Sequence, residues 1–222
     1  MGYSMSSTAL VTAPNSDPTT RYISIWAERT TEELKSKRLQ FILLLRERAV
    51  ASVFESMLKK HGPSLLFLNG HGGPDVVCGH NDEVLVKAGK NELALQGMVT
   101  YALSCSSAKT LGPAAIQAGA RAYIGYNEDF IFFISPEKVN RPREDKTAEM
   151  FLMPANHVVV SLAKGHTVGE ATNAAKGYFL RSIQKLISSE SSDEDREYVR
   201  YLIWDMRSLV CQGNHDAVVV SK

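Results

Sequence analysis

Short continuous apolar runs alternate with helix-like segments through the middle of the chain. Three such runs, at 64–69, 98–104 and 121–126, are rich in aliphatic and aromatic residues. Their length favours strands that are buried on both faces, as in a parallel sheet. A small-residue helix is expected from Gly112-Pro113 to Gly119, because proline suits the first turn of a helix. The alternation predicts an α/β fold in which one parallel or mixed sheet is covered by helices on both faces.

The amino-terminal part of the chain is expected to begin with a disordered leader. Residues 1–20 are rich in Ser, Thr, Pro and Asn and lack the apolar segment of a signal peptide, so residues 21–222 are expected to form a single domain. The alternating segment 21–26 predicts a first strand. Thr30 and Glu33 match a capping box, which predicts a long helix that extends to Gly62.

The remaining elements follow from similar local patterns. They are a hairpin of 75–77 and 83–87, helices at 157–164, 167–187 and 196–210, and a final strand at 217–220. The helix at 167 opens with a capping box of Thr167 and Glu170. A loop region is expected at 127–146, and a polar acidic loop at 188–195.

Composition narrows the functional classes. The 222 residues include 25 Lys and Arg against 24 Asp and Glu, a formal charge of +1, so the basic excess that nucleic-acid binders usually show is absent. No apolar run approaches the roughly 18 residues of a membrane span. The three cysteines, Cys78, Cys105 and Cys211, are an odd number and too few for a disulfide framework. We therefore expect a cytoplasmic globular protein that binds neither nucleic acid nor a membrane and keeps at least one free thiol.

Two predicted strand ends carry candidate chemistry. His71 follows the first apolar run in a glycine-rich turn, and Cys105 follows the second run within Ser104-Cys105-Ser106-Ser107. Cys105 lies 34 residues after His71 (105 − 71), about one crossover unit plus a hairpin, so the two strands can be neighbours. Ligand sites of such sheets form beyond the carboxyl ends of the strands.

A cysteine nucleophile needs a base, electropositive surroundings and donors for the oxyanion. His71 can act as the base. The backbone N–H groups of Gly72 and Cys105 can form a two-donor oxyanion hole, because a glycine without a Cβ lets its backbone approach a substrate carbonyl. By contrast, His61-Gly62 has the pattern of a helix C-cap, and we expect Cys78 and Cys211 to have no chemical role.

These motifs resemble the caspase-like cysteine peptidases, the group that includes caspases, gingipains, separase and CHAT domains. The resemblance lies in an apolar strand that ends in His-Gly (LLFLNGHGG), a second that ends in the nucleophile (VTYALSCSS), and the helix and strand after it (LGPAAIQAGARAYIGY). A later segment, AKGHTVGEATNAAK, is similar to a helix of CHAT and gingipain-type domains, the closest members in pattern.

The resemblance implies a three-layer sandwich and a cysteine endopeptidase without a cofactor or metal. His71 would be the general base and acid, and Cys105 the nucleophile that forms an acyl-enzyme. A protein or peptide would be the substrate, with an activating partner or a homo-oligomer as a further possibility. The family needs no obligatory third catalytic residue, so none is assigned. The chain departs from the family pattern in the Ser-Ser-Ala-Lys that follows Cys105.

Specificity and processing give two weaker hypotheses. In the family, the loop after the third strand helps to build the S1 pocket, and here it carries Glu128 and Asp129. Carboxylates in that pocket would favour Arg or Lys at P1, although an exposed acidic turn explains them equally well. The basic loop 141–146 is a candidate autoprocessing site, with a plain surface loop as the favoured interpretation.

Three alternatives remain open at the level of sequence. A serine esterase of the α/β-hydrolase type would use Ser104 as nucleophile and His215 as base, although the elbow glycines are missing. A metal site would draw on two irregular sets of ligands: His71, Cys78 and His80, or Cys211 and His215. A caspase-like fold that serves only as a scaffold or binding module is the third alternative.

Overall fold

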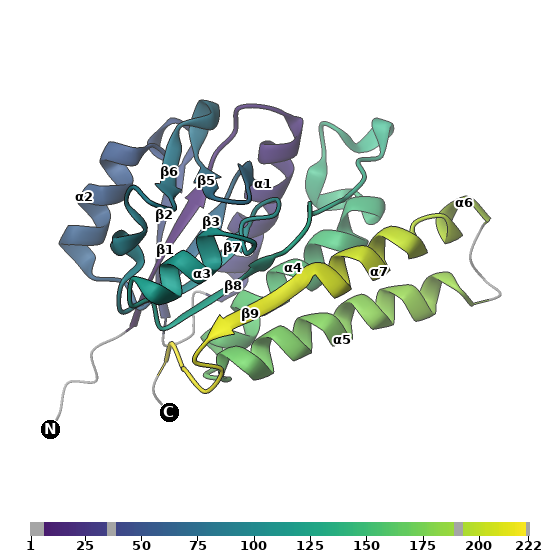
Figure 1. Ribbon diagram of the computed structural model, residues 1–222. Helices are drawn as coiled ribbons and strands as arrows, with labels where there is room; N and C mark the ends of the chain where they lie inside the picture. Colours follow the sequence, from purple (N-terminus) through teal and green to yellow (C-terminus); the bar gives the residue numbers. More distant parts are fainter. Residues whose placement is uncertain (1–6, 35–38, 189–192, 221–222) are drawn as a thin grey trace, which may run out of the picture.

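The computed structural model describes residues 7–34, 39–188 and 193–220, which form three layers (Figure 1). The middle layer of this described part is a six-stranded sheet. In spatial order its strands are β2 (Leu39–Leu45), β1 (Ser7–Ala13), β3 (Leu65–Asn69), β7 (Val99–Leu103), β8 (Ala122–Tyr126) and β9 (Leu209–Gly213). Neighbours from β2 to β8 are parallel, and β9 pairs antiparallel with β8 at the edge. The expected α/β sandwich with a mostly parallel sheet is confirmed.

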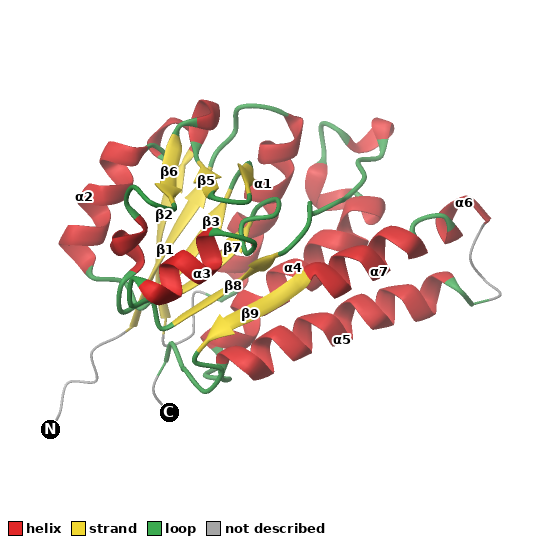
Figure 2. Cartoon of the chain, in the orientation of Figure 1, coloured by secondary structure: helices red, strands yellow, loops and turns green. Residues whose placement is uncertain are grey.

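Helices cover both faces of this sheet (Figure 2). One face carries α1 (Pro18–Glu33), α4 (Lys146–Ala163), α5 (Val168–Leu186) and α7 (Val199–Ser208), and the other carries α2 (Ala51–His61) and α3 (Leu111–Gln117). The short α6 (Asp193–Arg196) precedes α7. Along β3, Leu65 and Phe67 pack in the first core, and Leu66 and Leu68 pack in the second. Because both sides of β3 are buried, its sequence is a continuous apolar run.

A second, three-stranded sheet follows β3 directly. Its strands are β4 (Gly72–Gly73), β5 (Val76–Cys78) and β6 (Val84–Lys87), all antiparallel, with β5 in the centre. The predicted hairpin is therefore confirmed, and the glycine turn adds a short edge strand to it. His71 lies in the link between the two sheets.

The disordered leader is wrong for most of its length. Residues 7–13 form β1, which pairs with β2 on one side and β3 on the other, and Ala9, Leu10 and Val11 are fully buried. The strand is hard to recognise because small residues fill most of its positions, so its apolar signal is short. Residues 1–6 of the expected leader lie outside the described residues.

The predicted strand at 21–26 is also wrong, because it lies inside α1. Pro18 occupies the first turn, and Asp17 and Thr20 form the capping box of this helix. Tyr22 and Trp26 are one helical turn apart and both buried, so the pattern fits a helix as well as a strand.

The long helix expected from Thr30 is replaced by three elements. The helix that contains Thr30 ends at Glu33, residues 39–45 form β2, and α2 begins only at Ala51. Residues 35–38 lie outside the described part. The prediction failed because β2 is a half-buried edge strand, and the spacing of its apolar residues also fits the apolar stripe of a helix.

The carboxyl-terminal predictions are partly correct. The capping box of Thr167 and Glu170 opens α5 as expected. The last helix, α7, is shorter than predicted, since residues 209–213 form β9, and 217–220 form no strand. The helix expected at 157–164 begins earlier, at Lys146, where Asp145 caps it. None of the helices in the described ranges combines the length and apolar character that a membrane crossing needs.

Candidate active site

The two candidate catalytic residues lie beyond the ends of neighbouring parallel strands. Strands β3 and β7 are paired up to Asn69 and Leu103, and His71 and Cys105 each follow two residues later. The prediction that these strands are neighbours is confirmed. Parallel strands end at the same edge of a sheet, so both residues lie at the carboxyl-terminal edge, where ligand sites of α/β sheets form.

Gly72 packs directly against the residue that precedes Cys105. A Cβ at Gly72 would overlap the Ser104 hydroxyl and would lie 2.7 Å from the Val76 carbonyl oxygen. Only glycine allows the His71 turn to approach the Cys105 turn this closely. This contact joins the two strand ends on which the candidate residues lie.

The N–H of Gly72, a predicted oxyanion donor, has no ladder partner among the described residues. Cys78 N–H donates to the His71 carbonyl oxygen (2.8 Å), so His71 and Cys78 form a hydrogen-bonded pair of the β4–β5 ladder. The next pair, Gly72 and Val77, is then of the non-hydrogen-bonded type. Because β4 is an edge strand, the Gly72 N–H points to its open side. The second predicted donor, the Cys105 N–H, stands at the start of the turn that follows β7.

The Cys105 thiol is half-buried and points to another partner than His71. Its Sγ lies 3.9 Å from the Phe130 carbonyl oxygen, and within the described residues it has no hydrogen bond with His71. Burial raises the pKa of the Cys105 thiol, and the carboxylates of Asp129 and Asp205 add to this shift. The resting site therefore holds a neutral thiol.

Alkylation tests this resting state. We expect the iodoacetamide reaction of Cys105 to be slower at neutral pH than that of a free cysteine peptide, and to keep rising above pH 9, because only the thiolate reacts. Mass spectrometry of the Cys105 peptide, with the urea-unfolded chain as control, measures the rate at each pH. A rate that levels off at the same pH as in the urea-unfolded control, or at a lower pH, would contradict a raised pKa.

The turn after Cys105 is fixed to the loop after β8. Ser106 has a positive φ of 52°, which is uncommon outside glycine. Its N–H donates to the Glu128 carbonyl oxygen (3.0 Å), and its hydroxyl donates to the Asp129 carboxylate (2.7 Å). These bonds hold a strained backbone at the residue next to Cys105.

The predicted specificity residues lie beside this turn, and both have partners. Lys109 pairs with the Glu128 carboxylate (3.1 Å), and Asp129 accepts the Ser106 hydroxyl. Glu128 also lines an open cavity of about 430 Å³, together with Trp204 and other residues of α7 and the β8 loop: Asn127, Arg200, Ile203, Arg207 and Ser208. Two guanidinium groups therefore share this cavity with one carboxylate.

Asp17 is a residue of the site that the sequence prediction missed. Its carboxylate oxygen Oδ2 lies 2.9 Å from Nε2 of His71, whose side chain is 41% exposed. The missed signal was local: Asp followed by Pro, with Thr three residues later, is typical of a helix N-cap. This signal was not used because residues 1–20 were expected to form a disordered leader.

A buried carboxylate anchors the segment that covers Cys105. Asp205 of α7 is fully buried and accepts the Ile131 N–H (3.0 Å), while its second oxygen has no hydrogen-bond partner among the described residues. Burial raises the pKa of Asp205 well above its ordinary value. The hydrogen bond between the Ile131 N–H and Asp205 therefore fixes the backbone directly after Phe130, whose carbonyl oxygen faces Cys105.

The basic loop 141–146 is less free than expected. Arg143 pairs with both carboxylate oxygens of Glu32 (2.9 and 3.1 Å), and Pro142 and Asp145 are buried. Cleavage in this loop would require the Arg143–Glu32 pair to break and the segment to leave the surface of α1.

The geometry does not favour the serine esterase or the metal site. His215 follows β9, whose Gly213 is paired with Ala122 at the start of β8, so it lies at the opposite edge of the sheet from Ser104. Ser104 Oγ is buried beneath Gly72. No group of three or more His, Cys, Asp or Glu side chains in the described residues is placed to hold a metal ion.

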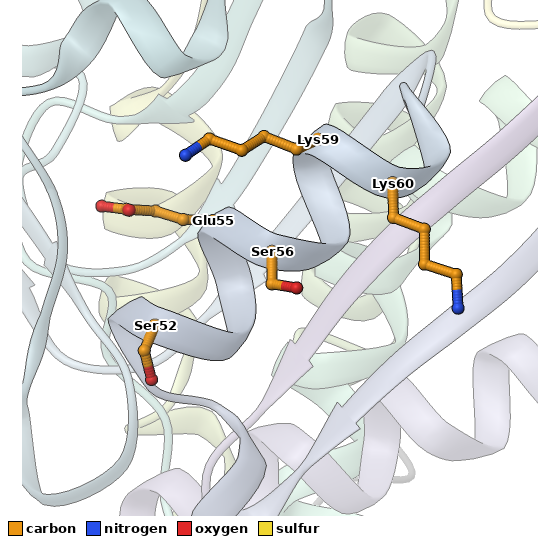
Figure 3. A pocket seen from close by; sticks show the side chains of 5 residues that line it. All are labelled: Ser52, Glu55, Ser56, Lys59 and Lys60. Carbon is orange, nitrogen blue, oxygen red and sulfur yellow. The ribbon is translucent and has the colours of Figure 1, made fainter.

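Another surface hollow lies elsewhere. It has a volume of about 560 Å³ and is lined by five residues of α2 alone: Ser52, Glu55, Ser56, Lys59 and Lys60 (Figure 3). It contains none of the candidate catalytic residues, and its side chains extend from one helix face into the open.

No protein-family model matches the chain, and no curated protein matches its sequence.

Proposed function

We propose that the protein is a cysteine endopeptidase in which Cys105 is the nucleophile and His71 the general base and acid. The observation that supports this most is the packing of Gly72 on Ser104, which brings the two strand ends that carry the pair together. His71 takes the thiol proton as the Cys105 sulfur attacks the peptide carbonyl. The C–N bond then breaks, His71 gives the proton to the leaving amine, and water hydrolyses the thioester. The N–H groups of Gly72 and Cys105 stabilise the oxyanion.

The resting thiol must move before this reaction can start. It must leave the Phe130 carbonyl and rotate toward His71, and its raised pKa means that the proton leaves only when His71 is near. The protein is therefore a latent peptidase that a substrate or partner activates. A non-catalytic scaffold is the alternative that the buried thiol favours.

A peptide library with a varied P1 residue tests the proposal. We expect the wild type to cleave after Arg or Lys, and Cys105→Ala and His71→Ala to lose cleavage, while Ser104→Ala keeps it. A peptide acyloxymethyl ketone should label Cys105 in the wild type and not in His71→Ala. A preference for Asp at P1 would overturn the role of Glu128 and Asp129 and point to Arg200 and Arg207. Absence of cleavage and of labelling would favour the scaffold.

A further inference from the structure

Three neighbouring strands place an acid, an imidazole and a thiol in that order. The central sheet runs β1, β3, β7, and Asp17, His71 and Cys105 follow the carboxyl ends of these strands. His71 therefore comes from the strand between those that lead to Asp17 and Cys105. One nitrogen of His71 is engaged by Asp17, and Nδ1 has no hydrogen bond within the described residues.

The two oxygens of Asp17 do different work. Oδ1 accepts the N–H groups of Thr19 (2.8 Å) and Thr20 (3.0 Å) and so caps α1. Oδ2 accepts the Thr20 hydroxyl (2.9 Å) and lies 2.9 Å from His71 Nε2. The cap fixes the rotamer of the carboxylate, and that rotamer aims Oδ2 at the imidazole.

The segment that carries Asp17 is also tied to the hairpin that follows His71. The Ser16 hydroxyl accepts the Asn81 N–H (2.6 Å) and lies 3.2 Å from His80 Nδ1. Since the chain runs from His71 through β4 and β5 to His80, both partners of the Asp17–His71 pair are held in one frame.

An ionised carboxylate can only accept hydrogen bonds, so His71 Nε2 must carry the proton in this pair. Burial acts to raise the pKa of Asp17, but the hydrogen bonds from Thr20 and His71 outweigh it and the net pKa is below the ordinary value. In the neutral imidazole Nδ1 is then the unprotonated nitrogen, and it is the one available for the thiol proton. When Nδ1 takes that proton, the adjacent carboxylate stabilises the imidazolium.

We propose that Asp17 is a positioning residue that fixes the tautomer and orientation of His71 for reaction with Cys105. This inference rests on the proposed peptidase function. Asp17 touches no substrate: it keeps its charge through the cycle, while the proton passes from Cys105 to His71 Nδ1 and then to the leaving amine.

Asp17→Asn separates this role from helix capping. Asparagine caps a helix as well as aspartate does, so its Oδ1 can still accept from Thr19 and Thr20. Its NH₂ group, however, would donate to Nε2 and move the imidazole proton to Nδ1. We expect kcat to fall by roughly 10²-fold or more with little change in KM, as when a base is held in the wrong tautomer. Thr20→Val is the matched control, since it removes only the Thr20 hydroxyl from the cap, while the N–H groups of Thr19 and Thr20 still hold Oδ1 and keep Oδ2 facing His71.

Three measurements decide the outcome: the pH profile of Cys105 labelling by the peptide ketone, ¹⁵N NMR of the His71 ring, and urea unfolding. For Asp17→Asn the proposal predicts an unchanged free energy of unfolding, a proton on Nδ1 of the His71 ring, and slower labelling of Cys105 at every pH. For Thr20→Val it predicts a lower free energy of unfolding and labelling at the wild-type rate. An active wild type with equally active Asp17→Asn would overturn the positioning role and leave the peptidase intact. A wild type that neither cleaves nor labels would overturn both.

Discussion

Replacing Gly72 by alanine is expected to disable the site while the rest of the fold persists. The new Cβ would overlap Ser104 Oγ and meet the Val76 carbonyl oxygen at 2.7 Å. The serine hydroxyl can rotate, but the backbone carbonyl of β5 cannot move alone, so β4 must shift away from the end of β7. A displacement of about 1 Å at a catalytic pair can cost roughly 10²-fold in rate, and overpacking costs about 1–3 kcal/mol.

Gly73→Ala is the matched control for this substitution. Its Cβ would meet only Val76 Cγ1, at 3.7 Å, which is an ordinary contact. Rates of Cys105 labelling by the peptide ketone, together with urea unfolding, compare the two variants. Equal labelling rates would show that the approach of the two strand ends is not needed for reactivity.

The central strands were predictable because burial on both faces leaves a plain signal. Strands β3, β7 and β8 are continuous apolar runs, and each was placed within one or two residues. Strand β1 is as deeply buried, but its residues are small and it follows a polar stretch. Segment 21–26 fits two periodicities, and only the cap at Asp17 distinguishes helix from strand there.

The site was predictable only as far as chain order sets it. The two strand ends could be paired because parallel neighbours end at one edge. The Asp17–His71 contact joins residues 54 apart, across a strand that the sequence did not reveal. The direction of the Cys105 thiol depends on the Phe130 carbonyl oxygen. The position of Phe130 depends in turn on the hydrogen bond between the Ile131 N–H and Asp205, two residues that are 74 positions apart in the chain. Local patterns contain no information on such contacts.

The loop that covers Cys105 is held by two buried carboxylates, which bind it at Ile131 and at Ser135. Asp205 accepts the Ile131 N–H, and Asp145 accepts the Ser135 N–H (2.9 Å). Aromatic rings around Ile131 continue the packing: Tyr126 lies against Phe130, and Phe130 against Phe132. The loop expected at 127–146 is thus an ordered part of the fold, and its stability should depend on these anchors.

Asp145→Ala is expected to give the largest loss of stability of the substitutions considered. The carboxylate is fully buried and accepts from the Tyr22 hydroxyl (3.0 Å), from Ser135 N–H and hydroxyl, and from the Ala148 N–H at the start of α4. Burial and the bond to Asp145 raise the pKa of Tyr22 to about 12. Removing the acceptor leaves these buried donors without a hydrogen bond, which costs about 1–3 kcal/mol for each donor. We therefore expect a loss of at least ~3 kcal/mol in the free energy of unfolding.

Thr167→Ala provides the comparison, because Thr167 caps α5 at an exposed position and joins no buried network. Loss of such a cap costs about 1 kcal/mol. Urea unfolding of the two variants therefore separates the capping contribution from that of the network that ties α1, the loop and α4 together. If Asp145→Ala lowered the free energy of unfolding no more than Thr167→Ala does, the buried carboxylate would act as a helix cap alone. The loop over Cys105 would then be held by the aromatic packing and by Asp205.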